Sequence, residues 1–191
     1  MSRVTLIKPR RFADERGWFS ETYSHRAMAA LGIADAFVQD NHSLSRPVGT
    51  LRGLHFQVPP HGQGKLVRCT TGRIMDYAVD VRRGSPTYGR HVSAELTAAN
   101  GWQLWVPVGF AHAFVTLEPD CEVVYKVTDY YAPECDGGIR WDSAGIDWPL
   151  PPGGAVLSDK DRRLPALADF DSPFPYDGEP LPRSRLSGRL P

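Results

Sequence analysis

The sequence lacks the charge excess and the long apolar runs that mark two large classes of protein. Its 191 residues carry 22 Lys and Arg against 22 Asp and Glu, so the formal net charge is zero. Nucleic-acid-binding proteins usually show a basic excess. The longest mostly apolar stretch, Leu104 to Leu117, is too short for a membrane-spanning helix and contains Pro107, Gly109 and His112. We therefore expect neither nucleic acid nor a membrane among the partners, while a local basic pocket for an anionic small molecule stays compatible with zero net charge.

Cysteine is scarce as well. Cys69, Cys121 and Cys135 are odd in number and have no C-x-x-C spacing, which argues against a disulfide scaffold and predicts buried, reduced thiols. The N-terminal segment MSRVTLIKPRRF has no apolar signal-peptide core. Together these absences predict a cytoplasmic protein.

Glycine and proline, by contrast, are plentiful and separate short runs rich in β-branched and aromatic residues. In the run MDYAVDV, Met75, Tyr77, Val79 and Val81 share one face of an extended chain. Short strands between such turns favour a sandwich or barrel. We expect strands near residues 4–8, 37–43, 50–57, 65–71, 73–81, 89–96, 103–106, 113–117, 123–128 and 138–141, and one helix after Ser24.

The chain changes character towards its end. Prolines and glycines between residues 149 and 154 predict an irregular connection, and residues 172–191 contain five prolines. We expect a single domain over residues 1–171, followed by a Pro-rich tail over residues 172–191.

Two histidines lie in similar contexts, Gly49-x5-His55-x-Gln57 and Gly101-x5-Pro107-x-Gly109-x2-His112. These spacings resemble the two motifs of the cupin superfamily, which implies an all-β, double-sheet barrel (jelly roll) with short helices and an irregular C-terminal segment. Metal-binding cupins place a ligand where this chain has Gln57, and no Asp or Glu follows before Gly72. Two histidines fall short of the three or four ligands that a metal needs, so we expect no metal.

A histidine in such a cavity is suited to proton chemistry, because neutral imidazole accepts protons near neutral pH. It needs an orienting partner, an acid across the substrate and a cation for developing charge. The chain offers these residue types in Arg52, three residues before His55, in Lys65 on the next expected strand, and in Tyr125 within the run VVYKV. Arg52 and His55 differ by three positions, so they point to opposite faces of a strand unless Gly53 bends it.

Eight ordered blocks make the resemblance specific: DERGWFSET, QDNHS, TLRGLHFQ, GKLVR, SPTYGR, QLWVPVGFAHAF, YKVTDYYAPECDGGIRW and LSDKD. They resemble the dTDP-4-dehydrorhamnose 3,5-epimerases over about residues 14–161. The resemblance implies a homodimeric, metal-free, cofactor-free isomerase that inverts C5 and then C3 of dTDP-4-dehydro-6-deoxy-D-glucose. The product, dTDP-4-dehydro-L-rhamnose, feeds dTDP-L-rhamnose synthesis for cell-surface polysaccharides.

The resemblance also assigns roles to residues. It implies that His55 is the base, Asp161 orients it, Tyr125 is the acid on the other sugar face, and Lys65 and Arg52 lie near the keto oxygen. It implies that Tyr131 stacks on thymine. Further implied contacts to the nucleotide and sugar are Arg16, Glu21, Gln39, Asn41, His112, Lys160 and Asp136, the last where a glutamate is expected in the family.

Other interpretations stay open at this stage. The nearest is a single-centre sugar-nucleotide epimerase of the same fold, which would use the same base and acid. A metal-dependent cupin and a non-catalytic nucleotide-binding module are further alternatives. Without the resemblance, Tyr125 would be ordinary strand packing, Asp161 a solvated loop charge, and His112 equally a structural or a functional residue.

Overall fold

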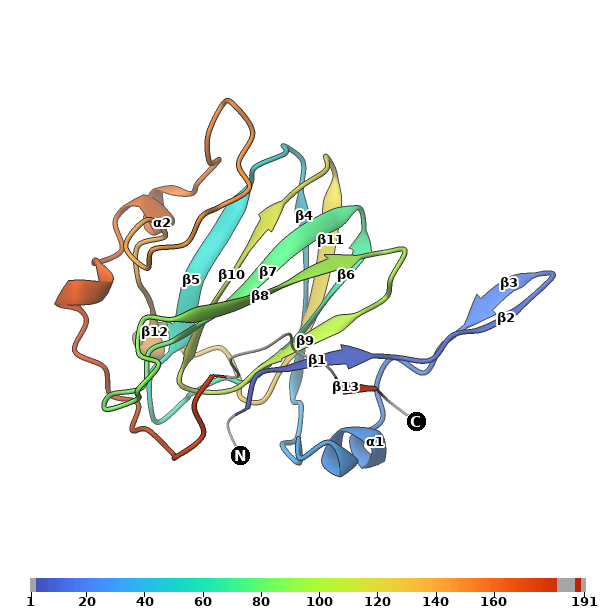
Figure 1. The fold of residues 1–191 in the computed structure, drawn as a ribbon, viewed down its shortest axis with the longest axis horizontal. Coiled ribbons are helices and arrows are strands. Elements are labelled where there is room, and N and C mark those ends of the chain that lie inside the picture. The colour runs from blue at the N-terminus through green and yellow to red at the C-terminus, as the bar shows by residue number, and fades with distance from the viewer. Residues whose placement is uncertain (1–2, 182–187, 190–191) are drawn as a thin grey trace.

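The computed structural model describes residues 3–181 and 188–189, which form two facing β-sheets (Figure 1). The larger sheet has the order β13-β1-β9-β6-β11-β4, and the smaller β12-β5-β10-β7-β8. All pairs are antiparallel except β1 with β13. The first sheet contains β1 (Thr5–Lys8), β4 (Gln39–Ser45), β6 (Lys65–Thr71), β9 (Gln103–Val106), β11 (Cys121–Val127) and β13 (Gly188–Arg189). The second contains β5 (Leu51–Gln57), β7 (Arg73–Asp80), β8 (His91–Thr97), β10 (Phe110–Thr116) and β12 (Asp136–Gly138).

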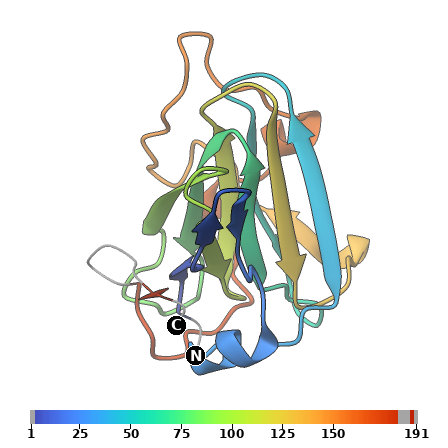
Figure 2. The same cartoon turned by 90° about the vertical axis from the view of Figure 1, so that its right-hand side faces the viewer.

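This architecture confirms the expected all-β double-sheet barrel with short helices. The helices are α1 (His25–Ala30) and α2 (Asp159–Arg162), with single 3-10 turns at Pro133–Cys135 and Leu167–Asp169. None of the helices in the described part of the chain has the length and apolarity needed to cross a membrane. Viewed from the side in Figure 2, β4 and β11 lie at one edge of the larger sheet.

Most strands lie where the sequence places them, and the differences have physical reasons. The strand expected at 113–117 is β10 and begins at Phe110, because both its faces are buried and no alternation marks its start. The strand expected at 138–141 is β12, whose Asp-Gly-Gly sequence has little strand propensity and is extended because it pairs with β5.

One hairpin was not expected at all. The charged residues of RRFADERG are typical of a polar turn, but this segment and the residues after it form β2 (Phe12–Asp14) and β3 (Gly17–Phe19). The hairpin projects away from the barrel (Figure 1), and all its strand residues are exposed.

The two faces of β7 show how the core is divided. Ile74 and Ala78 point between the sheets and join the core there. Tyr77 and Val79 lie on the outer face, where Trp148 and residues around it cover them. The alternation expected in MDYAVDV is therefore present, but its apolar face lies outside the barrel, under the irregular C-terminal segment.

The described part of the expected tail packs closely against the barrel. Phe174 is 2% exposed, and its carbonyl accepts a hydrogen bond from the Arg83 amide at 2.7 Å. The buried Arg82 guanidinium binds Asp80 and reaches Asp177 at 2.6 Å. Residues 182–187 and 190–191 of the expected tail lie outside the described residues, and a domain boundary at residue 171 stays a prediction.

Candidate active site

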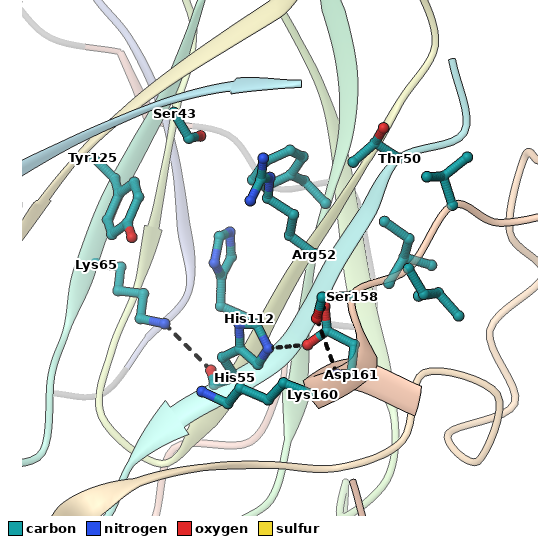
Figure 3. Close-up of a pocket in the computed structure, with 14 residues that line it drawn as sticks. Ser43, Thr50, Arg52, His55, Lys65, His112, Tyr125, Ser158, Lys160 and Asp161 are labelled. Atoms are coloured by element: carbon teal, nitrogen blue, oxygen red, sulfur yellow. Dashed lines mark hydrogen bonds and ion pairs between the residues drawn. The ribbon is translucent and has the colours of Figure 1, made fainter. Parts of the chain in front are cut away.

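A cavity of about 440 Å³ lies between the two sheets (Figure 3). Its walls combine cationic, carboxylate, hydroxyl and imidazole groups from both sheets with the segment that leads into α2. The lining residues are Ser43, Thr50, Leu51, Arg52, His55, Lys65, His112, Phe114, Tyr125, Val156, Leu157, Ser158, Lys160 and Asp161. The structure thus brings together seven of the residues expected from the sequence.

A bulge at Gly53 places Arg52 and His55 on the same wall. His55 pairs with His112 on β10, and Arg52 pairs with Phe114, so β5 advances three residues while β10 advances two. Gly53 lies within this bulge, and its φ of +133° is a backbone conformation that glycine adopts readily. The bend that the spacing required is therefore present.

Replacing Gly53 with alanine is expected to destabilise the protein by about 2–6 kcal/mol, the sum of backbone strain and overpacking. A Cβ there would lie 2.4 Å from the Ala113 Cβ and 2.6 Å from the His112 carbonyl oxygen. Denaturant unfolding measures the change. Gly17→Ala is the matched control, because Gly17 has a φ of +131° with no atom within 4 Å of its added Cβ. Equal losses from both substitutions would show that close packing at Gly53 contributes nothing.

His55 and Asp161 form a dyad with 2.5 Å between Nε2 and Oδ1. Ser158 caps α2 and donates to the other carboxylate oxygen at 2.8 Å, while its Oγ accepts from the Asp161 amide. Burial alone would raise the pKa of Asp161, but hydrogen bonds from His55 and Ser158 outweigh it and keep the pKa below its ordinary value. An ionised carboxylate only accepts, so the His55 Nε2 carries the hydrogen and Nδ1 is left as the proton acceptor.

The surroundings of the His55 ring favour its neutral form. Burial lowers the pKa of His55 below its ordinary 6.5, and the hydrogen bond with Asp161 opposes this only in part. The imidazole is therefore neutral at pH 7. Asp161, in turn, is 3% exposed within the one-turn helix α2. From the sequence alone, without the family resemblance, Asp161 would be interpreted as a solvated loop charge. It is buried because the tertiary fold packs α2 against β5.

Lys65 supplies a cation beside the dyad. Its Nζ donates to the His55 carbonyl oxygen at 3.4 Å, and burial lowers the pKa of Lys65 to about 8. The ammonium is thus mostly charged at pH 7, in a site where little water screens it. Arg52 adds a second cation, held by Ser45 at 3.0 Å and by the carbonyl of Leu44 at 3.1 Å.

Tyr125 faces the dyad from the opposite sheet. It lies on β11, paired with Asn41 of β4 and Val67 of β6, and its ring lines the cavity (Figure 3). Burial raises the pKa of Tyr125, so its hydroxyl stays protonated and can donate. His55 stands on the smaller sheet. A base and an acid therefore approach the same space from different walls.

A second dyad was not foreseen. His112 Nε2 lies 2.7 Å from Oδ1 of Asp76, and both side chains are buried. Burial raises the pKa of Asp76, and its Oδ2 has no hydrogen-bond partner in the structure. The sequence did contain one indication of this dyad. Asp76 is an acidic residue inside an expected strand whose other face is apolar, which suggests a polar interior.

Four expected substrate contacts lie beside the cavity instead of lining it. Asp136 bonds the Lys160 ammonium, which itself lines the cavity, and accepts from the Tyr131 hydroxyl at 3.2 Å. Gln39 accepts from the Tyr131 amide at 3.2 Å and donates to Asn41 at 2.9 Å. These residues form one connected polar group that reaches the cavity through Lys160.

Arg16 and Glu21 do not line the cavity of their own chain. Arg16 sits in the turn of the β2–β3 hairpin, 90% exposed and paired with Asp14 at 2.6 Å. Glu21 is exposed in the segment between β3 and α1. Within residues 3–181 and 188–189, no three His, Cys, Asp or Glu side chains converge as a candidate metal site.

The site has an unprotonated imidazole and a protonated phenol on opposite walls, with cations between them, which is an arrangement suited to moving protons at two faces of one bound molecule. The class that needs this arrangement is the epimerases and racemases.

Comparison with known proteins is specific. The dTDP-4-dehydrorhamnose 3,5-epimerase family profile matches residues 1–169. A curated dTDP-4-dehydrorhamnose 3,5-epimerase from Sinorhizobium fredii is 52% identical over 92% of this chain and 91% of its own. The chain belongs to the dTDP-4-dehydrorhamnose 3,5-epimerase family, as its sequence blocks indicated.

Solved structures agree with this assignment. The crystal structure of a Legionella pneumophila dTDP-6-deoxy-D-glucose-3,5-epimerase in complex with dTDP-4-keto-L-rhamnose superposes with a TM-score of 0.83 at 44% identity, covering 88% of this chain and 89% of that one. A 3'-monoepimerase from Streptomyces bikiniensis in complex with dTDP-quinovose is 32% identical, with a TM-score of 0.79 over 86% of this chain and 84% of its own.

Proposed function

We propose that this isomerase epimerises C5 and C3 of dTDP-4-dehydro-6-deoxy-D-glucose to dTDP-4-dehydro-L-rhamnose, with His55 as base and Tyr125 as acid. The observation that carries the proposal is the pair of groups on opposite walls of one cavity, each in the protonation state its role needs. Inversion of a carbon centre requires both, because the proton leaves from one face and returns to the other.

The chemistry follows from the ketone. A proton on a carbon beside the C4 carbonyl moves to the His55 Nδ1, and the electron pair of its C–H bond passes to the carbonyl oxygen as an enolate. Lys65 and Arg52 stabilise that oxygen's charge in a site largely shielded from water. Asp161 stabilises the imidazolium that forms. Tyr125 then donates its proton to the opposite face of the carbon, and solvent restores both groups.

Binding energy from the nucleotide positions the sugar. Tyr131, half exposed beside the cavity, has the flat face that a thymine ring stacks on, and Lys160 has the charge that a diphosphate requires. In this proposal Gln39, Asn41, Asp136 and His112 complete the contacts to the nucleotide and sugar.

Isotope exchange tests the reaction and its scope together. Incubation with the 4-keto sugar nucleotide in D2O should place deuterium at both C5 and C3 of the product, as read by NMR. Deuterium at one centre alone would replace the double epimerase with a single-centre enzyme. Binding of dTDP with an unchanged substrate spectrum would leave only a nucleotide-binding module.

The pH dependence of kcat/KM is expected to be bell-shaped. The depressed pKa of His55 puts the acid limb below pH 6.5, where protonation removes the base. Loss of the Lys65 charge puts the alkaline limb near pH 8. A Lys65→Arg variant keeps its charge above that pH, so its alkaline limb should move upward. An unmoved limb in this variant would remove Lys65 from the assignment.

We also propose that the active form is a homodimer in which the β2–β3 hairpin of one subunit serves the partner's cavity. Phe12, Trp18 and Phe19 are 52%, 58% and 70% exposed on this projecting hairpin, which also carries Arg16 (Figure 1). Exposed apolar side chains of this size commonly mark an interface. Mixing inactive Arg16→Ala and His55→Asn variants should then restore activity, because one site of each mixed dimer has both residues intact. No restoration in a confirmed dimer would count against the exchange.

The buried thiols are the basis for placing this enzyme in the cytoplasm, which we propose as its compartment. Cys69, Cys121 and Cys135 are all free and buried in the structure, as a reducing compartment permits. Cell fractionation with an antibody to the protein tests this.

A further inference from the structure

Gln57 is a buried amide that the proposed reaction does not use. It ends β5, two residues after His55, and is 3% exposed. A primary amide buried without hydrogen bonds destabilises a fold, so its partners indicate what it is for.

The partners of Gln57 are all backbone groups of two loops. Its Nε2 donates to the His61 carbonyl at 2.7 Å and to the Tyr130 carbonyl at 3.1 Å. Its Oε1 accepts from the Ala132 amide at 2.9 Å. Tyr130 and Ala132 are the two neighbours of Tyr131, so one side chain holds the backbone on both sides of that residue.

Tyr131 depends on such support because its own side chain is 57% exposed. Its amide donates to Gln39 and its hydroxyl to Asp136, both at 3.2 Å. An exposed aromatic residue on a loop binds a flat ligand best when its backbone is already ordered, because ordering it during binding costs affinity.

The geometry points to Gln57 as a positioning residue that pre-orders Tyr131 for the nucleotide base. This inference rests on the proposed function, specifically on base stacking by Tyr131. Gln57 occupies the position where metal-binding cupins carry a ligand. In this chain its amide hydrogen-bonds to the backbone of two loops and does not line the cavity.

A merely structural role for Gln57 would be to join the two loops, and the chain offers a control for that. Gln63 also links them, donating from Nε2 to the Asp129 carbonyl at 2.8 Å, but it does not contact the residues flanking Tyr131. Gln63→Met therefore removes one loop-joining hydrogen bond and leaves the proposed support intact.

The test is a double-mutant cycle on dTDP affinity, measured by calorimetry, together with kcat and KM. Gln57→Met should weaken dTDP binding and raise KM by on the order of tenfold, comparable to losing a stacking contact, with kcat within about twofold of wild type. Tyr131→Ala should weaken dTDP binding at least as much. In the Tyr131→Ala background, Gln57→Met should add almost nothing, since it acts through that ring. Gln63→Met should leave dTDP affinity unchanged.

The outcomes distinguish the positioning role of Gln57 from the stacking role of Tyr131. If Tyr131→Ala weakens dTDP binding and Gln57→Met does not, or if their effects simply add, Gln57 does not position Tyr131 while the stacking role stands. If neither substitution weakens dTDP binding, the stacking role itself fails. Gln57→Glu keeps the acceptor for the Ala132 amide and loses both donors. Its dTDP affinity should therefore lie between those of wild type and Gln57→Met. This variant provides the test if Gln57→Met does not fold, and wild-type affinity for Gln57→Glu would overturn the inference.

Discussion

Replacing His55 with asparagine should abolish deuterium uptake at both C5 and C3 while leaving dTDP binding intact. Asparagine preserves much of the shape of the side chain but cannot accept a proton at this pH. A positioned base contributes on the order of 10²–10⁴ in rate, and in the proposed reaction one base serves both centres, so both exchanges should fall by at least that factor. NMR of the substrate in D2O measures each centre separately.

A control distinguishes loss of the base from loss of the fold. His25→Asn changes an exposed histidine at the start of α1, remote from the cavity lining, and should leave both exchange rates unchanged. Asp161→Asn should give a smaller loss than His55→Asn, because the base remains but no ionised partner selects its tautomer or stabilises the imidazolium. Exchange at either centre persisting at the wild-type rate in His55→Asn would assign the base elsewhere, with His112 as the next imidazole on the same wall.

Replacing Tyr125 with phenylalanine should separate proton removal from inversion. The base and the cations stay in place, so the substrate still loses its proton to His55 and regains deuterium from the same face. Without the phenol, the opposite wall loses the donor assigned to protonate the second face, although Lys65 and Ser43 remain on that sheet, and formation of the inverted product should fall on the order of 10²–10⁴-fold. The signature is deuterium at C5 with retained configuration, appearing at a rate within about tenfold of wild type.

Tyr88→Phe is the matched control for this change, since Tyr88 lies outside the cavity and its hydroxyl reaches only the Phe170 carbonyl at 3.5 Å. It should behave as wild type in both exchange and inversion. Equal losses of exchange and inversion in Tyr125→Phe would mean that the tyrosine acts in proton removal and not as the acid. Inversion at the wild-type rate would mean that water or another donor on that wall, Lys65 or Ser43, protonates the second face.

Strand positions were predictable because strands alternate with turn residues along this chain. The expected ranges for β5, β6 and β9 agree with the structure to within one residue. The prediction failed where local sequence carries little preference. Buried on both faces, β10 lacks alternation at its start, and β12 is a strand only because β5 pairs with it. The β2–β3 hairpin contains charged residues, which are equally typical of a turn.

The candidate site residues likewise divide into those that the sequence identified and those that only the tertiary structure brought together. His55 and Arg52 were identifiable from their motif, but whether they share a wall depended on the Gly53 bulge. Asp76 was missed because its partner, His112, is thirty-six residues away in sequence. Asp161 meets His55 only because the segment before α2 docks beside β5, where the Leu51 amide donates to the Val156 carbonyl and the Val156 amide donates to the Gly49 carbonyl.

By itself the sequence determined the double-sheet class, the absence of a disulfide scaffold and the residue types of the candidate site. These depend on periodicity, composition and local motifs, all of which are properties of neighbouring residues. The tertiary structure alone decided which face of β7 points inward, which carboxylate meets which imidazole, and that the hairpin projects away from its own cavity. Those outcomes depend on contacts between residues far apart in the chain, whose register is set by the packing of the whole barrel.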